Sequence, residues 1–334
     1  MFTSMLRCCA AGAGLWASLA AAEPVKLKLA FLLSDRTSAY VDMVKPFVDA
    51  VNGDPRKEIQ IDVYSSGMLG KSPAQQAQLV LDGIADIAFV VPISPPLFPD
   101  NAVVELPGLF QGLREATVVF TRLVAAKALK GYDDFYVIGT LATEPESIHV
   151  RRPIASLDDL KGQRIRASGP IEAAALAKLG MTPVIIPAVT VSEAISSGAI
   201  DGAAIAPALL HEFGVGRVAP YHYLLRTSAG TLTLLMNRKV FDALPETAQD
   251  TIRRHSGEWM AARFADGYEV TNTQAIEKLR ADPRRKVIVP TAAELETAQA
   301  AFRAVTEEWA AAEPRHRQLL DLANAEIVKF RSTR

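Results

Sequence analysis

Cysteine is almost absent from this sequence, and so are the short motifs of catalytic chemistry. The two cysteines, Cys8 and Cys9, lie near the N-terminus, so no disulfide, thiolate nucleophile or cysteine-ligated metal is expected beyond residue 22. The five histidines are scattered, and none has the H-E-x-x-H spacing of a zinc site. No G-x-S-x-G, P-loop or G-x-G-x-x-G motif occurs. We therefore predict neither catalytic residues nor a metal or cofactor, although a Ser–His–Asp set assembled from distant segments would leave no local motif.

An excess of charge of one sign is also missing. The chain has 36 basic and 37 acidic residues, which gives no electrostatic reason to expect nucleic acid or an anionic membrane as a partner. Its longest apolar run, residues 8–21, is too short to span a bilayer well. That run follows Arg7 and ends in three alanines before Glu23. This pattern predicts a signal peptide over residues 1–22 and, with no cysteine beyond it, a periplasmic protein; an uncleaved N-terminal anchor is the alternative.

A strand–helix–strand–helix–strand pattern occurs twice, over residues 26–91 and 164–206. The two copies agree best at their ends, where Gly83–Ala88 and Gly198–Ala203 both read G-x-x-D-x-A. The chain of 334 residues is also too long for one ordinary core. We therefore predict an α/β protein with two similar lobes and mostly parallel sheets.

The rest of the chain completes this division. We assign residues 23–142 and 228–262 to lobe I and residues 143–227 and 263–300 to lobe II, with a helical tail over 301–334. Few helix-breaking residues occur between Ala248 and Leu279, which predicts one long helix packed across both lobes. A cleft between the lobes follows from this arrangement.

Arg166 is the strongest candidate for binding a ligand in that cleft. Ligands of open α/β sheets bind beyond the carboxyl ends of the strands, and Arg166 ends a predicted strand there. The small residues Ala167–Gly169 follow and open a helix, whose N-terminus favours an anion. The planar guanidinium matches a carboxylate with two hydrogen bonds, although a salt bridge to Asp158 or Glu172 is the alternative role. The other positions predicted to line the site are Arg36 in the equivalent turn of lobe I, Ser168, Tyr40, Phe89, Pro92, Val191 and Ile205.

Several segments in order resemble the DctP-like solute-binding proteins of tripartite ATP-independent periplasmic (TRAP) transporters. They cover nearly all of the chain beyond residue 22, and they include Tyr64–Gly70 (YSSGMLG), Leu106–Phe110 (LPGLF), Ser156–Arg166 (SLDDLKGQRIR) and Gly198–Gly202 (GAIDG). The resemblance implies a two-lobed periplasmic-binding-protein fold with a long C-terminal helix behind both lobes. It also implies that Arg166, the arginine that ends the third segment, pairs with the carboxylate of an organic acid. Closure of the lobes would trap the ligand for membrane permease subunits driven by an ion gradient.

Two departures from this family bear on the ligand. Glu146 stands near the place where sialic-acid-binding members have a second arginine, and Ala203–Ala206 is apolar where those members have a polar residue. We therefore expect a small monocarboxylate with an apolar or aromatic body, with Glu146 either accepting a hydrogen bond from it or stabilising the hinge. A periplasmic enzyme or a ligand-presenting sensor on the same scaffold remains an alternative. The sequence leaves open whether the chain is a monomer or a homodimer.

Overall fold

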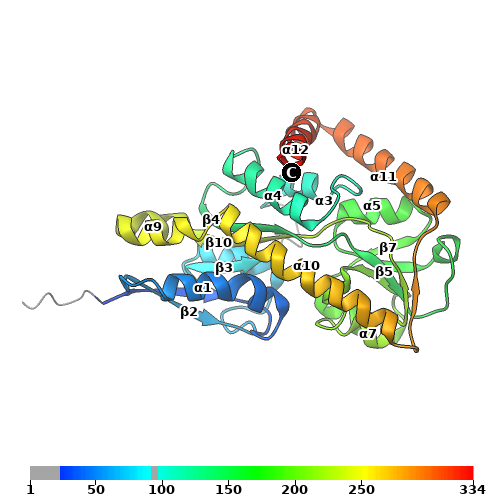
Figure 1. The fold of residues 1–334 in the computed structure, drawn as a ribbon, viewed down its shortest axis with the longest axis horizontal. Helices are drawn as coiled ribbons and strands as arrows, with labels where there is room; N and C mark the ends of the chain where they lie inside the picture. The colour runs from blue at the N-terminus through cyan, green and yellow to red at the C-terminus, as the bar shows by residue number, and fades with distance from the viewer. Residues whose placement is uncertain (1–22, 92–96, 334) are drawn as a thin grey trace, which may run out of the picture.

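Two mixed β-sheets form the centre of the molecule, which we describe from a computed structural model for residues 23–91 and 97–333 (Figure 1). The first sheet has the strand order β2-β1-β3-β10-β4, and the second has the order β11-β9-β5-β8-β6-β7. The strands of the first sheet are β1 (Val25–Ala30), β2 (Ile59–Tyr64), β3 (Ile87–Val90), β4 (Phe135–Ala142) and β10 (Thr231–Asn237). Those of the second are β5 (Ser147–Val150), β6 (Arg164–Ala167), β7 (Thr182–Ile185), β8 (Gly202–Ile205), β9 (Tyr221–Tyr223) and β11 (Lys286–Ile288).

Twelve α-helices cover these sheets in the described part of the chain. The first half of the chain contains α1 (Lys45–Asn52), α2 (Gln76–Leu81), α3 (Ala102–Glu105) and α4 (Leu113–Ala125). The second half contains α5 (Pro170–Lys178), α6 (Val191–Ser197), α7 (Val215–Val218), α8 (Arg238–Ala243), α9 (Glu246–Arg254), α10 (Glu258–Ala281), α11 (Ala292–Ala312) and α12 (Pro314–Ser332). Three short helices of other types also bear on the site, namely η1 (Ala39–Val44), η3 (Pro99–Asn101) and η6 (Pro207–Leu209).

The internal repeat predicted from the sequence is present in both sheets. In each copy the first strand lies between the other two and runs parallel to them, as β2-β1-β3 and as β7-β6-β8. The expectation of mostly parallel sheets is confirmed, since all described strands but one in each sheet run in the same direction. The next strand, β10 in one sheet and β5 in the other, runs antiparallel, because the chain reaches it by crossing over from the other lobe.

The G-x-x-D-x-A motif has the same structural role in both copies. Gly83 and Gly198 have φ values of 70° and 77°, the left-handed conformation that ends a helix. Asp86 Oδ2 accepts a hydrogen bond from Lys28 N at 2.7 Å, and Asp201 Oδ2 accepts one from Arg164 N at 3.0 Å. In each case the carboxylate therefore ties the third strand of the repeat to the first.

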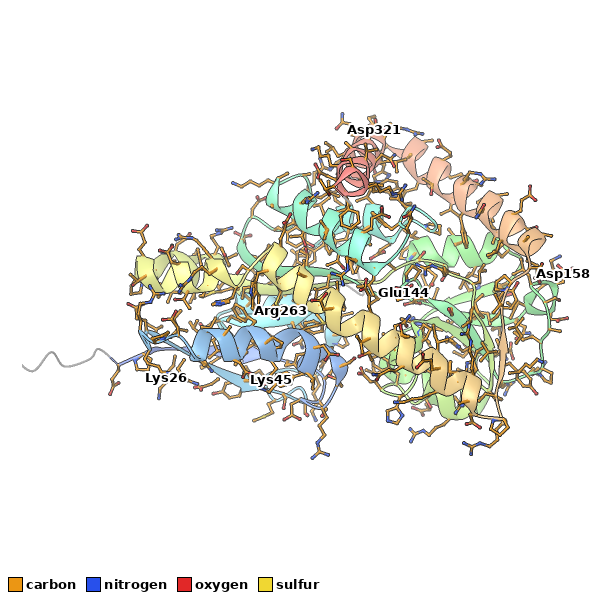
Figure 2. The ribbon with its side chains drawn as sticks, viewed as in Figure 1. Lys26, Lys45, Glu144, Asp158, Arg263 and Asp321 are labelled. Carbon is orange, nitrogen blue, oxygen red and sulfur yellow. The ribbon has the colours of Figure 1, made fainter. Side chains whose placement is uncertain are left out.

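Three connections join the lobes. Two are the crossovers at 143–146 and 224–230, which are hydrogen-bonded to each other through pairs such as Glu146 N to Ser228 O at 2.9 Å. Figure 2 shows Glu144 of the first crossover in the middle of the molecule. The third is α10, which packs on α4, β4 and η1 of lobe I and on η6 and β11 of lobe II (Figure 1).

The long helix differs from its prediction in one respect. The expected helix over residues 248–279 is divided into α9 and α10, and the break falls at Gly257, whose φ is 62°. The boundary that we set at residue 262 between the lobes falls inside α10, so the division of the chain there stays a prediction. The strands themselves lie within the ranges assigned to each lobe.

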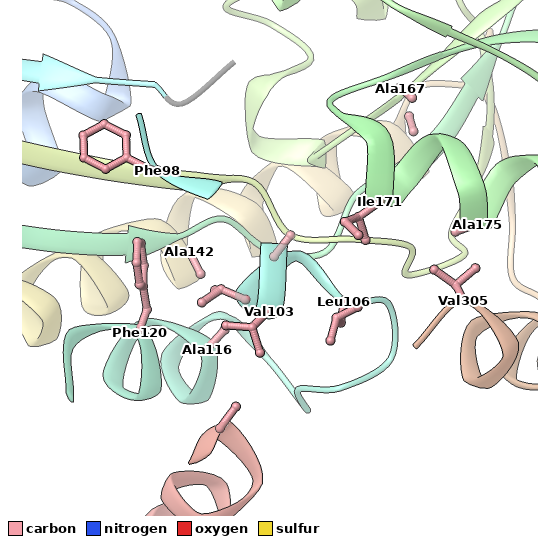
Figure 3. Close-up of a cluster of buried hydrophobic side chains, with 14 of the residues drawn as sticks. Phe98, Val103, Leu106, Ala116, Phe120, Ala142, Ala167, Ile171, Ala175 and Val305 are labelled. Atoms are coloured by element: carbon pink, nitrogen blue, oxygen red, sulfur yellow. The ribbon is translucent and has the colours of Figure 1, made fainter. Parts of the chain in front are cut away.

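One buried apolar cluster runs from lobe I into lobe II through the tail (Figure 3). It includes Val103 and Phe120 of lobe I, Ile171 and Ala175 of lobe II, and Val305 of the tail. The tail contacts both lobes, because α11 packs on α5 of lobe II while α12 packs on α3 and α4 of lobe I. The lobes are thus in apolar contact on the side that the tail covers.

Candidate functional site

A cavity of about 360 Å³ lies between the lobes, at the carboxyl ends of β1, β3, β6 and β8. This is where ligands bind in open α/β sheets. Most of its wall is apolar, with a few polar side chains, as in binding sites for small molecules. Among the apolar and aromatic residues that line it are Leu33, Phe89, Phe98, Ile171, Ile205, Leu209, Phe213 and Trp309.

Arg166 is buried at the wall of this cavity, with 6% of its surface exposed. Its Nε donates to the carbonyl oxygen of Ile186 at 3.2 Å. Its Nη1 donates to the carbonyl oxygen of Ala204 at 2.8 Å and to Glu146 Oε2 at 3.2 Å. Among the described residues, no hydrogen bond uses Nη2. The guanidinium is therefore fixed on three sides and keeps one nitrogen available, and its salt bridge is to Glu146 rather than to Asp158 or Glu172.

Glu146, the salt-bridge partner of this arginine, also interacts with a second carboxyl group, that of Glu172. Glu146 lines the cavity at the end of the first crossover, and Glu172 lies on α5. Burial raises the pKa of Glu146 well above its usual value, and the negative charge of Glu172 adds to this effect, while Arg166 opposes it. The pKa of Glu146 thus depends on its burial and on two neighbouring charges of opposite sign.

Glu172 also occupies the helix N-terminus that the sequence suggested as an anion site. Its Oε2 accepts hydrogen bonds from Ser168 N and Ser168 Oγ, both at 2.8 Å, and its Oε1 accepts one from Thr227 Oγ1 at 2.7 Å. Ser168 lines the cavity, but its amide and hydroxyl groups are thus already paired within the protein.

A third acidic side chain, Glu105 at the end of α3, lines the same cavity. Its Oε1 accepts a hydrogen bond from Thr231 Oγ1 at 2.9 Å. Burial raises the pKa of Glu105 to about 7, against the effect of that hydrogen bond and with support from the charge of Glu172. Near neutral pH this side chain therefore exists in both protonation states.

The structure brings together some of the predicted site residues and separates others. Phe89, Ile205, Ser168, Glu146 and Arg166 line one cavity. Their contact with a ligand stays a prediction.

Arg36 is exposed and lines a different cavity of about 650 Å³ beside α10. The two cavities share Glu212 of lobe II, whose Oε1 accepts hydrogen bonds from Ser38 N and Ser38 Oγ of lobe I at 2.6 Å each. This contact joins the lobes between the two cavities.

The remaining predicted residues do not line the cavity of Arg166 in the described part of the structure. Tyr40 is half-buried, with its ring 5.4 Å from that of Phe31. Val191 is fully buried in the core of lobe II. Pro92 lies outside the described residues.

Sequence reasoning missed several polar residues at this cavity, namely Asn101, Glu105, Thr143, Glu212, Thr231, Tyr268 and His316. Tyr268 follows Phe264 by one helical turn, so the pattern predicts an ordinary core position for it. Asn101 and Glu105 precede a Leu-Pro turn, where polar residues are common. No local signal separates such residues from surface ones.

Over residues 23–91 and 97–333, no group of three His, Cys, Asp or Glu side chains is placed to hold a metal ion. No helix in these same ranges is long and apolar enough to cross a membrane.

Known proteins resemble this chain in sequence and in fold. A solute-binding protein of Sulfitobacter sp. (strain NAS-14.1) is 26% identical over 224 residues, which is 65% of this chain and 68% of that protein. A TRAP solute-binding protein from Rhodoferax ferrireducens T118, in complex with copurified benzoate, is 25% identical with a TM-score of 0.84, and the match covers 92% of this chain and 99% of that one.

A TRAP solute-binding protein from a marine metagenome has the same fold. It is described as specific for aromatic acid ligands, and its structure contains 3-hydroxybenzoate. It is 23% identical, with a TM-score of 0.83 and coverage of 92% of this chain and 99% of that one.

The family model of the bacterial extracellular solute-binding proteins, family 7, matches residues 31–313. This match confirms the resemblance seen in the sequence, and the two-lobed fold agrees with it. The chain therefore belongs to the DctP family of bacterial extracellular solute-binding proteins.

Proposed function

We propose that this chain is the solute-binding subunit of a TRAP transporter and captures a small monocarboxylic acid with an apolar or aromatic body. The observation that carries the proposal is Arg166, a buried cation at the wall of a mainly apolar cavity with its Nη2 uncommitted in the described structure. A ligand carboxylate would accept charge-assisted hydrogen bonds from the N–H groups of this nitrogen. The benzoate and 3-hydroxybenzoate found in the two structural relatives support this class of ligand.

Capture would proceed by closure of the lobes. A ligand that contacts Arg166 and Ile205 of lobe II and Phe89 of lobe I gains contacts from both lobes only when they are close together, so it favours the closed state. The hydrogen bonds from Ser38 to Glu212 would stabilise the same state. We further propose that the protein acts in the periplasm, after export directed by residues 1–22, and that the closed form docks on membrane permease subunits. The family consists of solute-binding proteins, and we expect no catalytic turnover of the ligand.

The test is a ligand panel followed by thermal unfolding and isothermal titration calorimetry. Benzoate, phenylacetate and hydroxybenzoates should raise the unfolding temperature and bind one to one, because a ligand of the folded state alone stabilises it. Benzyl alcohol, which has the ring without the carboxylate, and galacturonate should not. Tighter binding of a sugar acid than of every aromatic acid would reject the proposed ligand class. Stoichiometric conversion of the bound acid to product would favour an enzyme instead.

Binding of the acid should weaken as the pH rises from 6 to 8. The pKa of Glu105 is raised to about 7, so its ionisation adds a negative charge to the cavity that holds the ligand carboxylate. The bound ligand should therefore raise the pKa of Glu105. For each unit of that rise, the dissociation constant of the ligand should increase by about tenfold between low pH, where Glu105 is protonated, and high pH, where it is ionised.

Calorimetric titration at several pH values measures this effect. The Glu105→Gln variant should show a flatter dependence, while Glu296→Gln, at an exposed position on α11, should behave as the wild type does. An equal slope in the wild type and in Glu105→Gln would contradict the assignment.

A further inference from the structure

Tyr268 lines the cavity and carries a buried hydroxyl group that has no hydrogen-bonding partner in the described structure. The residue is 2% exposed, it lines the cavity of Arg166, and its Oη makes no hydrogen bond in the structure as described. Buried hydroxyl groups are nearly always paired, since leaving one unpaired costs about 1–3 kcal/mol. For an unpaired hydroxyl on a residue that lines a binding cavity, the ligand is a natural source of the missing partner.

The position of this hydroxyl group is well fixed. Tyr268 lies in the middle of α10, and its ring packs against that of Phe264 with centroids 5.1 Å apart. Near it, Thr271 Oγ1 bonds to Asp42 of lobe I at 3.3 Å, and Asn272 Oδ1 accepts from Ala208 N of lobe II at 3.3 Å. The helix turn that carries Tyr268 is therefore hydrogen-bonded to both lobes, which fixes the place where a ligand group would contact Tyr268.

The surroundings keep the hydroxyl protonated. Burial raises the pKa of Tyr268 well above its usual value, and the charges of Glu212, Glu146 and Glu144 act in the same direction. A neutral phenol both donates and accepts a hydrogen bond. Its complement is a hydroxyl group rather than a second carboxylate, because these acidic neighbours disfavour another negative charge in the cavity.

We propose that Tyr268 determines specificity by pairing with a hydroxyl group on the body of the ligand, so that the protein prefers a hydroxy-substituted aromatic or apolar monocarboxylic acid over the unsubstituted acid. This inference rests on the proposed function, since it places a second recognition point in the cavity of Arg166. A site built to pair with a ligand hydroxyl discriminates strongly against the analogue that lacks it, because the protein group is then left buried and unpaired.

The experiment compares benzoate with its 2-, 3- and 4-hydroxy derivatives, and phenylacetate with mandelate, by calorimetric titration. In the wild type, at least one hydroxy acid should bind roughly ten- to a hundredfold more tightly than its parent acid. In Tyr268→Phe this preference should fall to within about twofold while the parent acid binds as well as before, because Phe keeps the ring and removes only the unpaired hydroxyl. Thermal unfolding of the free protein checks that the variant is folded.

Two controls make the result specific to this residue. Tyr223→Phe changes a fully buried tyrosine of β9 that does not line the cavity, so the preference should survive. Asn101→Ala changes another cavity residue with a buried polar atom, Nδ2, that has no partner in the described structure, as is also true of Oε2 of Glu212. Loss of the preference in Asn101→Ala but not in Tyr268→Phe would overturn the assignment to Tyr268.

Other outcomes also decide the matter. A wild type that binds all parent and hydroxy acids equally would overturn this inference and leave the proposed function intact. An equal loss of affinity for both kinds of acid in Tyr268→Phe would show a structural role only and would overturn it as well. Failure of the wild type to bind any carboxylic acid would overturn both the inference and the proposed function.

Discussion

Arg166→Ala is expected to weaken binding of the acid by about 2–5 kcal/mol, which is roughly thirty- to several-thousandfold in the dissociation constant. The variant removes the buried cation whose Nη2 faces no other partner in the described part of the protein. It also leaves the ligand carboxylate in an apolar cavity with Glu146 and Glu172 nearby. Calorimetric titration with the best acid of the panel measures the loss.

Two more arginine variants sharpen this result. Arg166→Lys keeps a positive charge but not the planar fork that bonds to Ile186, Ala204 and Glu146, so its affinity should lie between those of the wild type and Arg166→Ala. Arg36→Ala removes an exposed arginine of the other cavity and should leave the dissociation constant unchanged. Thermal unfolding of each free variant separates lost binding from lost folding. Wild-type affinity in Arg166→Ala would show that the carboxylate binds elsewhere.

A buried pair of histidines should make the protein lose stability in acid. His149 Nδ1 lies 2.8 Å from His222 Nδ1, and His149 Nε2 lies 3.1 Å from the carbonyl oxygen of Ile205. Because a carbonyl oxygen can only accept, His149 Nε2 carries the ring proton. His149 Nδ1 then accepts a hydrogen bond from the protonated Nδ1 of His222. The remaining nitrogen, His222 Nε2, faces Nη1 of Arg285 at 3.4 Å. Each ring is thus neutral, with a fixed tautomer.

Protonation of this pair is unfavourable in the folded state. Burial and the neighbouring His222 hold the pKa of His149 well below its usual value, and burial and Arg285 lower that of His222 to about 4. In the unfolded chain both titrate near pH 6.5. The unfolded state therefore binds more protons below pH 6.5, and the free energy of unfolding should fall by about 1.4 kcal/mol per pH unit for each histidine down to about pH 4.

Urea denaturation between pH 7 and pH 4.5 tests this expectation. His222→Gln, in which an amide N–H can still donate to His149, should reduce the slope of stability against pH by about 1.4 kcal/mol per unit. His211→Gln, at an exposed position, should follow the wild type. The same slope in His222→Gln as in the wild type would contradict the assigned neutral pair. Comparison of variants is needed because carboxylates such as Asp201, whose pKa is lowered to about 2, also weaken the fold in acid.

The features that the sequence predicted well are local or repeated. The glycine and aspartate of the G-x-x-D-x-A motif act through their own backbone conformation and through a neighbouring strand, so the repeat survives in the structure. The position of Arg166 near the carboxyl end of a strand follows from the local strand–turn–helix pattern and agrees with β6 and α5, while its contact with a ligand stays a prediction. The family resemblance led to the prediction that the ligand carries a carboxylate, and the family match confirms the resemblance itself.

The features that escaped prediction depend on side chains from distant segments. Glu172 lies one helical turn from Ser168, and only the three-dimensional structure shows that it takes the amide that we expected to bind an anion. Arg36 has the same place in the repeat as Arg166, yet it lines the other cavity. The contact of Ser38 with Glu212 lies between the two cavities. Tyr268 reaches the cavity from a helix more than a hundred residues after Arg166 along the chain.

The apolar cluster that passes from lobe I through the tail into lobe II has a thermodynamic consequence. Loss of the tail would expose apolar side chains of both lobes, for example Phe120 beside α12 and Ala175 beside α11. Each lobe also has buried apolar residues of its own, such as Phe47 in lobe I and Ile195 in lobe II. Unfolding of the tail would therefore weaken both lobes at once, so that the tail couples the stability of one lobe to that of the other.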